Sequence, residues 1–278
     1  MDLKHKFNFL FLCNMRRCPI CDSDGYSQIL TEEIFKIVKC NNCSLIYLLN
    51  PPDESEIYED YYEIEYKGKD YNENSNIQLL SEIFAINKQR KSEILKIKNS
   101  GELLDFGCGS GLFLKTMSDS FNVSGIDVSK KSITFAKEEF GLIVSNENAD
   151  DLLSKNKKFD IITLWHVLEH FLSPVDELKK IRNLLNDNGV LIVEVPNWES
   201  IKFQLSGKKW VGGNHPQYHR SFFTEKTLSG LFQTAGFSGH KNLNLSYDIA
   251  GKSKVYNLIK KSFNLINKDA FLNFIIYK

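Results

Sequence analysis

A glycine-rich turn in the middle of the chain constrains the fold most strongly. Residues 102–111 have the sequence ELLDFGCGSG, so a short apolar strand leads directly into Gly107, Gly109 and Gly111, and a helix is expected to begin near Leu112. Glycines at a strand end let the backbone turn sharply and approach a ligand, and the start of the next helix offers unpaired N–H groups. The dinucleotide-binding fingerprint would need its third glycine where Leu112 stands, so the spacing argues against a nicotinamide cofactor.

Strand-like and helix-like segments alternate around this turn. A helix is expected over 77–97, and Ser129, Ser173 and Thr224 are expected to begin three more, which end near Gly141, Asn186 and Gly236. Apolar runs predict strands at 102–106, 122–128, 142–145, 159–164, 190–195 and 271–277. Such alternation predicts an α/β fold, a doubly wound parallel sheet that binds its ligand at the carboxyl ends of the strands.

Three acidic residues follow successive predicted strands. Asp105 stands two residues before Gly107, where a carboxylate would repel a pyrophosphate and attract an ammonium group. Asp127 ends the next strand, where a carboxylate can accept both hydrogen bonds of a ribose diol. Asp150 follows the third strand and is placed to meet an adenine amino group. Together they predict a ligand that carries both a positive charge and a nucleoside. The alternative is a solvated strand-end acid at 105 and a helix N-terminal charge at 127.

Four of the six cysteines form two Cys-x-x-Cys pairs, Cys18 with Cys21 and Cys40 with Cys43. This spacing is typical of a zinc ribbon, in which four thiolates hold one structural Zn²⁺. Strand-like residues over 26–38 would supply the hairpin between the pairs. Two disulfides, or four unrelated thiols, are the alternative. Residues 1–75 hold 8 Lys and Arg against 14 Asp and Glu, so phosphate backbones would be repelled and we expect no nucleic-acid partner.

The composition is that of a globular protein: 278 residues, 42% apolar, with 35 Lys and Arg against 35 Asp and Glu. No apolar run is long enough for a membrane span, and the run near the N-terminus is too short for a signal peptide, so we expect a cytoplasmic protein. We expect a disordered extension over 1–14, the zinc ribbon over 15–50, a tyrosine-rich connector or lid over 51–76, and the main domain over 77–278. Nothing in the sequence predicts the oligomeric state.

Three motifs together resemble the class I S-adenosylmethionine-dependent methyltransferases. They are the turn that starts at Asp105, the Gly-Ile-Asp that ends at Asp127, and the run FDIITLWHVLEH over 159–170. The resemblance implies a Rossmann-like fold with a mostly parallel seven-stranded sheet. It also implies that Asp105, Gly107 and Gly109 hold the methionine part of S-adenosylmethionine, Asp127 the ribose and Asp150 the adenine, and that Trp165 and His166 line the cofactor near its sulfonium.

The ribbon, the connector and the segment from Pro196 to Thr224 resemble the bacterial sugar and surface-polysaccharide methyltransferases. This resemblance implies a small-molecule acceptor, and first of all a hydroxyl of a nucleotide-linked or polysaccharide sugar. Five basic residues against one acidic residue over 201–226, with Arg220 among them, favour an anionic acceptor such as a nucleotide sugar. A quinol or another small metabolite is the alternative acceptor, and an RNA methyltransferase or a cofactor-binding protein without catalysis is a more distant one.

A base is needed to take a proton from an oxygen or carbon acceptor, and histidine suits this role near neutral pH. We expect His219, His170 and Glu169 to be the catalytic residues. Sugar C-methyltransferases have a Tyr-His-Glu-His run where this chain has PQYH over 216–219, and the difference favours oxygen over carbon as the methylated atom. The run over 166–170 also matches the His-x-x-Glu-His pattern of inverted zinc proteases. Quinol methyltransferases share the Glu-His pair, which leaves an auxiliary divalent metal open.

Overall fold

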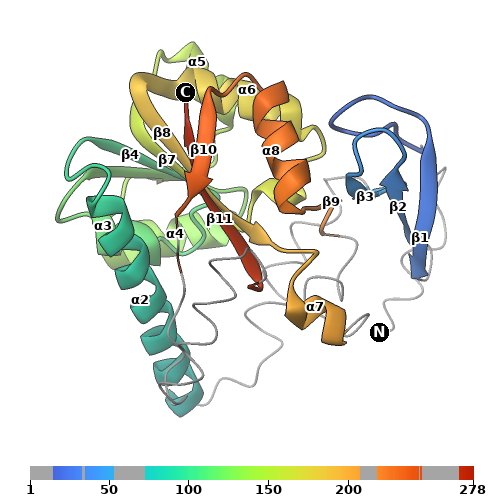
Figure 1. Cartoon of the computed structure of the whole chain (residues 1–278). Coiled ribbons are helices and arrows are strands. Elements are labelled where there is room, and N and C mark those ends of the chain that lie inside the picture. Colours follow the sequence, from blue (N-terminus) through green and yellow to red (C-terminus); the bar gives the residue numbers. More distant parts are fainter. Residues whose placement is uncertain (1–14, 33–34, 53–72, 207–217, 244, 246–268) are drawn as a thin grey trace.

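The computed structural model describes residues 15–32, 35–52, 73–206, 218–243, 245 and 269–278. Its main sheet has seven strands in the order β10-β11-β8-β7-β4-β5-β6 (Figure 1). The pairs from β8 to β6 are parallel, whereas β11 is antiparallel to both of its neighbours. The strands are β4 (Glu102–Phe106), β5 (Asn122–Ile126), β6 (Val144–Ser145), β7 (Phe159–Trp165), β8 (Leu185–Pro196), β10 (Gly239–Asn242) and β11 (Phe271–Tyr277). The predicted α/β fold with a mostly parallel seven-stranded sheet is confirmed.

Helices cover both faces of this sheet. One apolar core lies under α5, α6 and α8, and a second lies under α2, α3 and α4. Side chains of β8 alternate between the two cores, with Leu191 and Val193 in the first and Ile192 in the second, as a strand buried on both faces requires. The helices are α2 (Glu73–Leu95), α3 (Leu112–Met117), α4 (Lys130–Phe140), α5 (Ala149–Ser154), α6 (Pro174–Leu184), α7 (Ile201–Ser206) and α8 (Glu225–Thr234), with a short 3₁₀ turn η3 (Leu168–His170).

Local signals explain where the helices begin and end. The Ser129 side chain accepts from the Ser132 N–H at the start of α4, and Thr224 does the same for Thr227 at the start of α8. Gly141 ends α4 in the left-handed conformation that glycine adopts without strain. The prediction that α6 continues to residue 186 is wrong, because Leu185 is extended and pairs with Phe159 at the start of β8.

The four-cysteine segment folds into a second, smaller sheet in the order β1-β2-β3-β9 (Figure 1). β1 (Tyr26–Glu32), β2 (Phe35–Cys40) and β3 (Ile46–Leu48) come from the N-terminal segment, and β9 (Ser221–Phe222) comes from the second half of the chain. Its core is continuous with that of the main sheet, since Tyr47 and Leu49 belong to the same buried cluster as residues of α6 and α8. The residues expected to form the extension over 1–14, and most of the connector over 51–76, lie outside the described residues.

None of the helices in the described part of the chain is long and apolar enough to cross a membrane.

Candidate functional site

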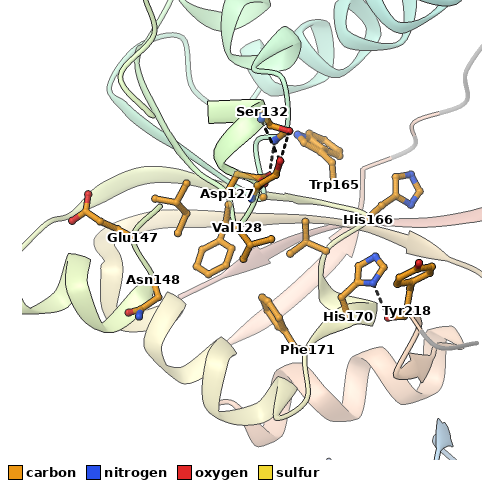
Figure 2. A pocket seen from close by; sticks show the side chains of 16 residues that line it. Asp127, Val128, Ser132, Glu147, Asn148, Trp165, His166, His170, Phe171 and Tyr218 are labelled. Carbon is orange, nitrogen blue, oxygen red and sulfur yellow. Dashed lines mark hydrogen bonds between the residues drawn. The ribbon is translucent and has the colours of Figure 1, made fainter. Parts of the chain in front are cut away.

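A cavity of about 430 Å³ lies at the carboxyl ends of β4, β5 and β7. In Figure 2, Glu147 and Asn148 lie at one end of it, His166 and His170 lie at the other, and Asp127 lies between them. This is the edge at which a doubly wound sheet binds its ligand, and the volume is typical of a small-molecule site.

The glycine turn forms one wall of the cavity. Gly107 has φ +82° and Gly109 has φ +51°, both in the left-handed region. The N–H groups of Gly107 and Cys108 both donate to the Ile126 carbonyl, which ties the turn to the end of β5. A side chain at Gly107 would collide with Val167, whereas the space beside Gly109 is open. Bare backbone therefore borders the cavity, as the sequence predicted.

Asp127 lies at the centre of the cavity wall, as Figure 2 shows. Its two carboxylate oxygens accept hydrogen bonds from the Gly109 and Ser129 N–H groups, each at 2.8 Å. Burial raises the pKa of this carboxyl, and the two hydrogen bonds partly offset the effect. Because each carboxylate oxygen can accept more than one hydrogen bond, both retain capacity toward a ligand diol.

Asp105 lies behind the glycine turn and is not among the residues that line the cavity. It is only 2% exposed and accepts a hydrogen bond of 2.6 Å from the Thr163 hydroxyl on the neighbouring strand. Burial raises its pKa to about 7, although the hydrogen bond from Thr163 and the charge of Arg90 act in the opposite direction. Its carboxyl therefore changes charge near neutral pH.

The structure places Asp150 outside the cavity lining, where its carboxylate pairs with Lys180 at 2.7 Å on the surface of α5 and α6. Glu147 and Asn148 line the cavity at this end instead. Asn148 caps α5 through its side-chain oxygen, and Glu147 accepts from the Ser145 hydroxyl. At this end, the lining of the cavity therefore comes from residues just before Asp150.

Trp165, the last residue of β7, and His166, which follows it, line the cavity away from Glu147 and Asn148. The guanidinium of Arg90 lies 4.0 Å from the centre of the Trp165 ring and donates to Glu194 at 2.5 Å. His166 Nε2 lies 3.1 Å from the same fully buried carboxylate. Sequence reasoning missed Arg90 and Glu194. A glutamate inside the otherwise apolar strand β8 was the signal that could have drawn attention to them.

His166 carries a positive charge at neutral pH in this arrangement. Burial alone would lower its pKa, but Glu169 at 3.7 Å and Glu194 outweigh that effect and raise the pKa to about 9. A histidine that stays protonated up to this pH cannot take a proton from an acceptor near pH 7. His166 is therefore suited to holding the local geometry and not to acting as a base.

η3 carries Glu169 and His170, and His219 reaches the His170 ring from the segment before β9. His170 lines the cavity, and its Nδ1 lies 2.8 Å from the Tyr218 carbonyl. Since a carbonyl only accepts, Nδ1 is the donor, and the neutral ring carries its lone pair on Nε2. The His170 and His219 rings meet edge to face, 5.0 Å between centroids. Glu169 and His219 do not line the cavity.

Glu169 is a buried carboxylate that is only 1% exposed. Among the described residues, neither of its oxygens has a hydrogen-bond partner. Burial would raise its pKa, but His166 and the charges of His170 and His219 hold the pKa below its usual range. One ligand atom from each of Glu169, His170 and His219 lies within 4.8 Å of the others, so this cluster could hold a divalent metal.

The basic residues expected over 201–226 are not among the described residues that line the cavity. Lys208 and Lys209 lie outside the described residues, as does the side chain of Lys202. Arg220 is only 1% exposed, and its guanidinium donates to the Pro52 carbonyl at 3.1 Å. Its charge is therefore engaged inside the protein, and the expectation that Arg220 contacts an anionic acceptor lacks support.

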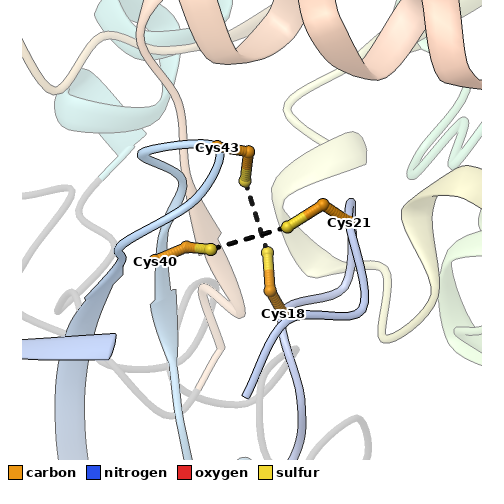
Figure 3. Close-up of side chains that lie close together, drawn as sticks. All are labelled: Cys18, Cys21, Cys40 and Cys43. Atoms are coloured by element: carbon orange, nitrogen blue, oxygen red, sulfur yellow. Dashed lines mark hydrogen bonds between the residues drawn. The ribbon is translucent and has the colours of Figure 1, made fainter. Parts of the chain in front are cut away.

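The four ribbon cysteines converge at a single point, as Figure 3 shows. The Sγ atoms of Cys18 and Cys43 are 3.4 Å apart, those of Cys21 and Cys40 are 3.5 Å apart, and all four lie within 4.8 Å of one another. Tetrahedral Zn²⁺ with bonds of about 2.3 Å separates its sulfurs by about 3.8 Å, close to these distances. All four thiols are free, and the Cys43 thiol lowers the pKa of Cys18 to about 5. The cluster fits the predicted zinc ribbon.

Comparison with known proteins shows the family to which the chain belongs. A family model described as a methyltransferase domain matches residues 73–242, more than half of the chain. The chain belongs to this methyltransferase family. The match begins with α2 and ends with β10, so it contains the glycine turn, Asp127 and η3.

Relatives and solved structures agree with this assignment. The chain is 27% identical over 186 residues to a ubiquinone biosynthesis O-methyltransferase of Cereibacter sphaeroides, an alignment that covers 62% of this chain and 71% of the relative. A SAM-dependent methyltransferase of Archaeoglobus fulgidus has the same fold, with a TM-score of 0.53, 19% identity, and coverage of 80% of this chain and all of that one. The plantazolicin methyltransferase BpumL in complex with SAH also has this fold, with a TM-score of 0.53, 18% identity, and coverage of 81% of this chain and 91% of that one.

The protein is thus an S-adenosylmethionine-dependent methyltransferase, as the sequence predicted. The cavity fits this cofactor because bare backbone, an open space beside Gly109 and a central carboxylate occur along one wall. The nicotinamide and protease alternatives are thereby set aside.

Proposed function

We propose that this methyltransferase methylates a hydroxyl oxygen of a small aromatic or otherwise largely apolar acceptor, and that His170 is the base. The observation that carries the proposal is the hydrogen bond from His170 Nδ1–H to the Tyr218 carbonyl, which leaves Nε2 as the proton acceptor in a residue that lines the cavity. The O-methyltransferases among the relatives support oxygen as the methylated atom.

Five residues would hold the cofactor. Gly107 and Gly109 would bring bare backbone to its methionine part, and Asp127 would accept hydrogen bonds from its ribose. Asp105, behind the turn, supplies a carboxylate toward its ammonium group. For the adenine edge, Asn148 would supply the polar contact, because it lines the cavity and Asp150 does not. When bound, S-adenosylmethionine supplies a methyl group on a sulfonium leaving group.

The remaining task of the protein is to align the acceptor and remove its proton. Phe171 and Tyr218 provide aromatic surface beside His170, on what would be the acceptor side of the cavity, and Trp165 also lines the cavity. No basic side chain lines the described cavity apart from His166 and His170. A phenolic hydroxyl suits this environment better than the phosphate groups of a nucleotide sugar. Glu169, held ionised beside His166 and His219, would stabilise the imidazolium that forms on His170. Positioning itself supplies much of the rate.

The test is product formation with labelled S-adenosylmethionine on two acceptor panels, one of catechols and quinols and one of nucleotide sugars. O-methylation of the phenolic panel is the expected result. In the His170→Asn variant, kcat should fall by about 100-fold or more while S-adenosylhomocysteine binds as in the wild type. His240→Asn is the matched control, because His240 bonds Ser229 far from the cavity.

Three results would contradict the proposal. Methylated sugars with unmodified phenols would reinstate the sugar acceptor. Full turnover in His170→Asn would place the base elsewhere. Loss of turnover on chelation, restored by a divalent cation while the zinc of the ribbon stays bound, would assign Glu169, His170 and His219 to a metal instead of to proton transfer.

A further inference from the structure

The small sheet is completed by the segment that approaches the acceptor side of the cavity. β3 pairs with β9, with Ile46 opposite Phe222 and Tyr47 opposite Ser221. The residues just before β9 are Tyr218, His219 and Arg220, which lie next to η3. The ribbon therefore continues, through a backbone ladder, into the segment that contacts the expected catalytic histidine.

Arg16 joins this ladder from a position two residues before the first ribbon cysteine. Its guanidinium donates to three backbone carbonyls: Leu48 at 2.9 Å, Leu172 at 2.9 Å and Arg220 at 2.5 Å. The Leu48 N–H also donates to the Arg220 carbonyl at 3.0 Å. One guanidinium thus connects the end of β3, the second residue after η3, and the residue that precedes β9. A planar group with several donors in fixed directions is suited to this.

The same few residues lead from the ribbon to the ring of His170. The Arg220 N–H donates to the Glu169 carbonyl at 2.8 Å, and the Tyr218 carbonyl accepts from His170 Nδ1 at 2.8 Å. The position of this segment therefore determines whether the Tyr218 carbonyl can fix the His170 tautomer. Arg220 holds the segment in place by burying its own guanidinium against the Pro52 carbonyl.

We propose that the four-cysteine ribbon is part of the acceptor half of the catalytic site, and that Arg16 is the positioning residue that transmits the ribbon's geometry to His170. This inference rests on the proposed role of His170 as base. The alternative is a ribbon that only stabilises the fold. Such a ribbon would leave turnover and the His170 tautomer unchanged as long as the protein remained folded.

Arg16→Gln is the decisive variant, with Arg17→Gln as its matched control. Arg17 is the adjacent residue, is largely exposed, and pairs only with Asp22 among the described residues. Each purified protein is assayed for zinc per chain, thermal midpoint, affinity for S-adenosylhomocysteine, kcat and KM for the acceptor, and the Nδ1–H signal of His170 in a spectrum of the ¹⁵N-histidine-labelled protein.

In Arg16→Gln we expect one zinc per chain, cofactor affinity within about twofold of wild type, a kcat lower by about 10- to 100-fold, and loss of the His170 Nδ1–H signal. Arg16→Lys should restore part of the kcat, because one ammonium can reach only some of the three carbonyls. Arg17→Gln should match the wild type in every measurement.

A lowered thermal midpoint with wild-type kcat and an intact His170 signal would overturn the proposal and leave the ribbon as a stabilising element. An equal loss of cofactor affinity and kcat would also overturn it, since the damage would then extend beyond the acceptor side. If Arg16→Gln does not fold, the wild-type protein is titrated with a zinc chelator below its melting temperature. The His170 signal should disappear there while S-adenosylhomocysteine still binds. If His170→Asn keeps full turnover, the base assignment fails, but the His170 signal still tests the coupling.

Discussion

Asp105 is a buried acid whose ionisation contributes to the pH dependence of folding. It is buried behind the glycine turn, and burial raises its pKa to about 7, whereas the same side chain in an unfolded chain titrates near 4. Between about pH 4 and pH 7 the unfolded chain has lost this proton and the folded protein has kept it. The free energy of unfolding therefore falls with rising pH across this window as far as this residue is concerned.

We predict that cofactor binding lowers the pKa of Asp105 again. An ammonium group near Asp105 stabilises its ionised form, so S-adenosylhomocysteine should bind more tightly as the pH rises through about 7 and should release a proton below that pH. Calorimetry in two buffers of different ionisation enthalpy measures the released proton. Asp105→Asn should abolish both the proton release and part of the pH dependence of unfolding, and exposed Asp187→Asn should change neither. Proton release that persists in Asp105→Asn would refute the assignment.

The sequence predicted those helices and strands that have a strong local signal, such as an apolar run or a helix cap. All six predicted strands of the main sheet are present, and so are the caps at Ser129 and Thr224. β9 was missed because a strand of two residues has no periodicity of its own and forms only by pairing with β3. The contact of Arg90 with Glu194 was missed for a similar reason, since α2 and β8 are distant in the chain and only the fold brings them together.

Substitutions at the two glycines of the turn between β4 and α3 should affect different properties, one the stability of the protein and the other the binding of the cofactor. Both Gly107 and Gly109 have positive φ, but a Cβ at Gly107 would lie 2.5 Å from Val167 Cγ2, whereas one at Gly109 meets nothing within 4 Å. Gly107→Ala should therefore lower the free energy of unfolding by about 1–3 kcal/mol more than Gly109→Ala. Gly109→Ala projects a methyl group into the cavity and should mainly weaken S-adenosylhomocysteine binding.

Urea unfolding and calorimetry on the two variants check this prediction. Val167→Ala in the background of Gly107→Ala should recover part of the lost stability, because it removes the colliding methyl group. Equal destabilisation by both glycine substitutions would show that the positive φ alone limits the turn.

At the scale of the whole molecule, the ribbon and the main domain share one buried core, so losing the metal should affect more than the ribbon. We predict one Zn²⁺ per chain by elemental analysis. Chelation, or Cys40→Ser, should lower the thermal midpoint by at least about 5 °C, and re-added Zn²⁺ should restore it only in the chelated wild type. Metal analysis that finds no zinc in freshly purified protein would remove this prediction and the zinc site with it.

The acceptor is the part of the function that the sequence predicted least well. The expected basic loop depended on counting charges over 201–226, but the count could not show that Arg220 is buried against the Pro52 carbonyl. The glycine turn and Asp127 were predictable because their spacing reflects the backbone geometry that the cofactor needs. Acceptor contacts come from segments that meet only in three dimensions, such as η3 and the residues before β9.

Completion of the small sheet by β9 has a consequence for biosynthesis. The ribosome makes β3 long before Ser221 and Phe222, so the outer edge of β3 lacks its final partner while residues 49–220 are being translated. An open strand edge invites pairing with other nascent chains. The cysteines, in contrast, are all available once Cys43 has emerged. Early metal loading would therefore hold the hairpin in a compact shape until β9 pairs with β3.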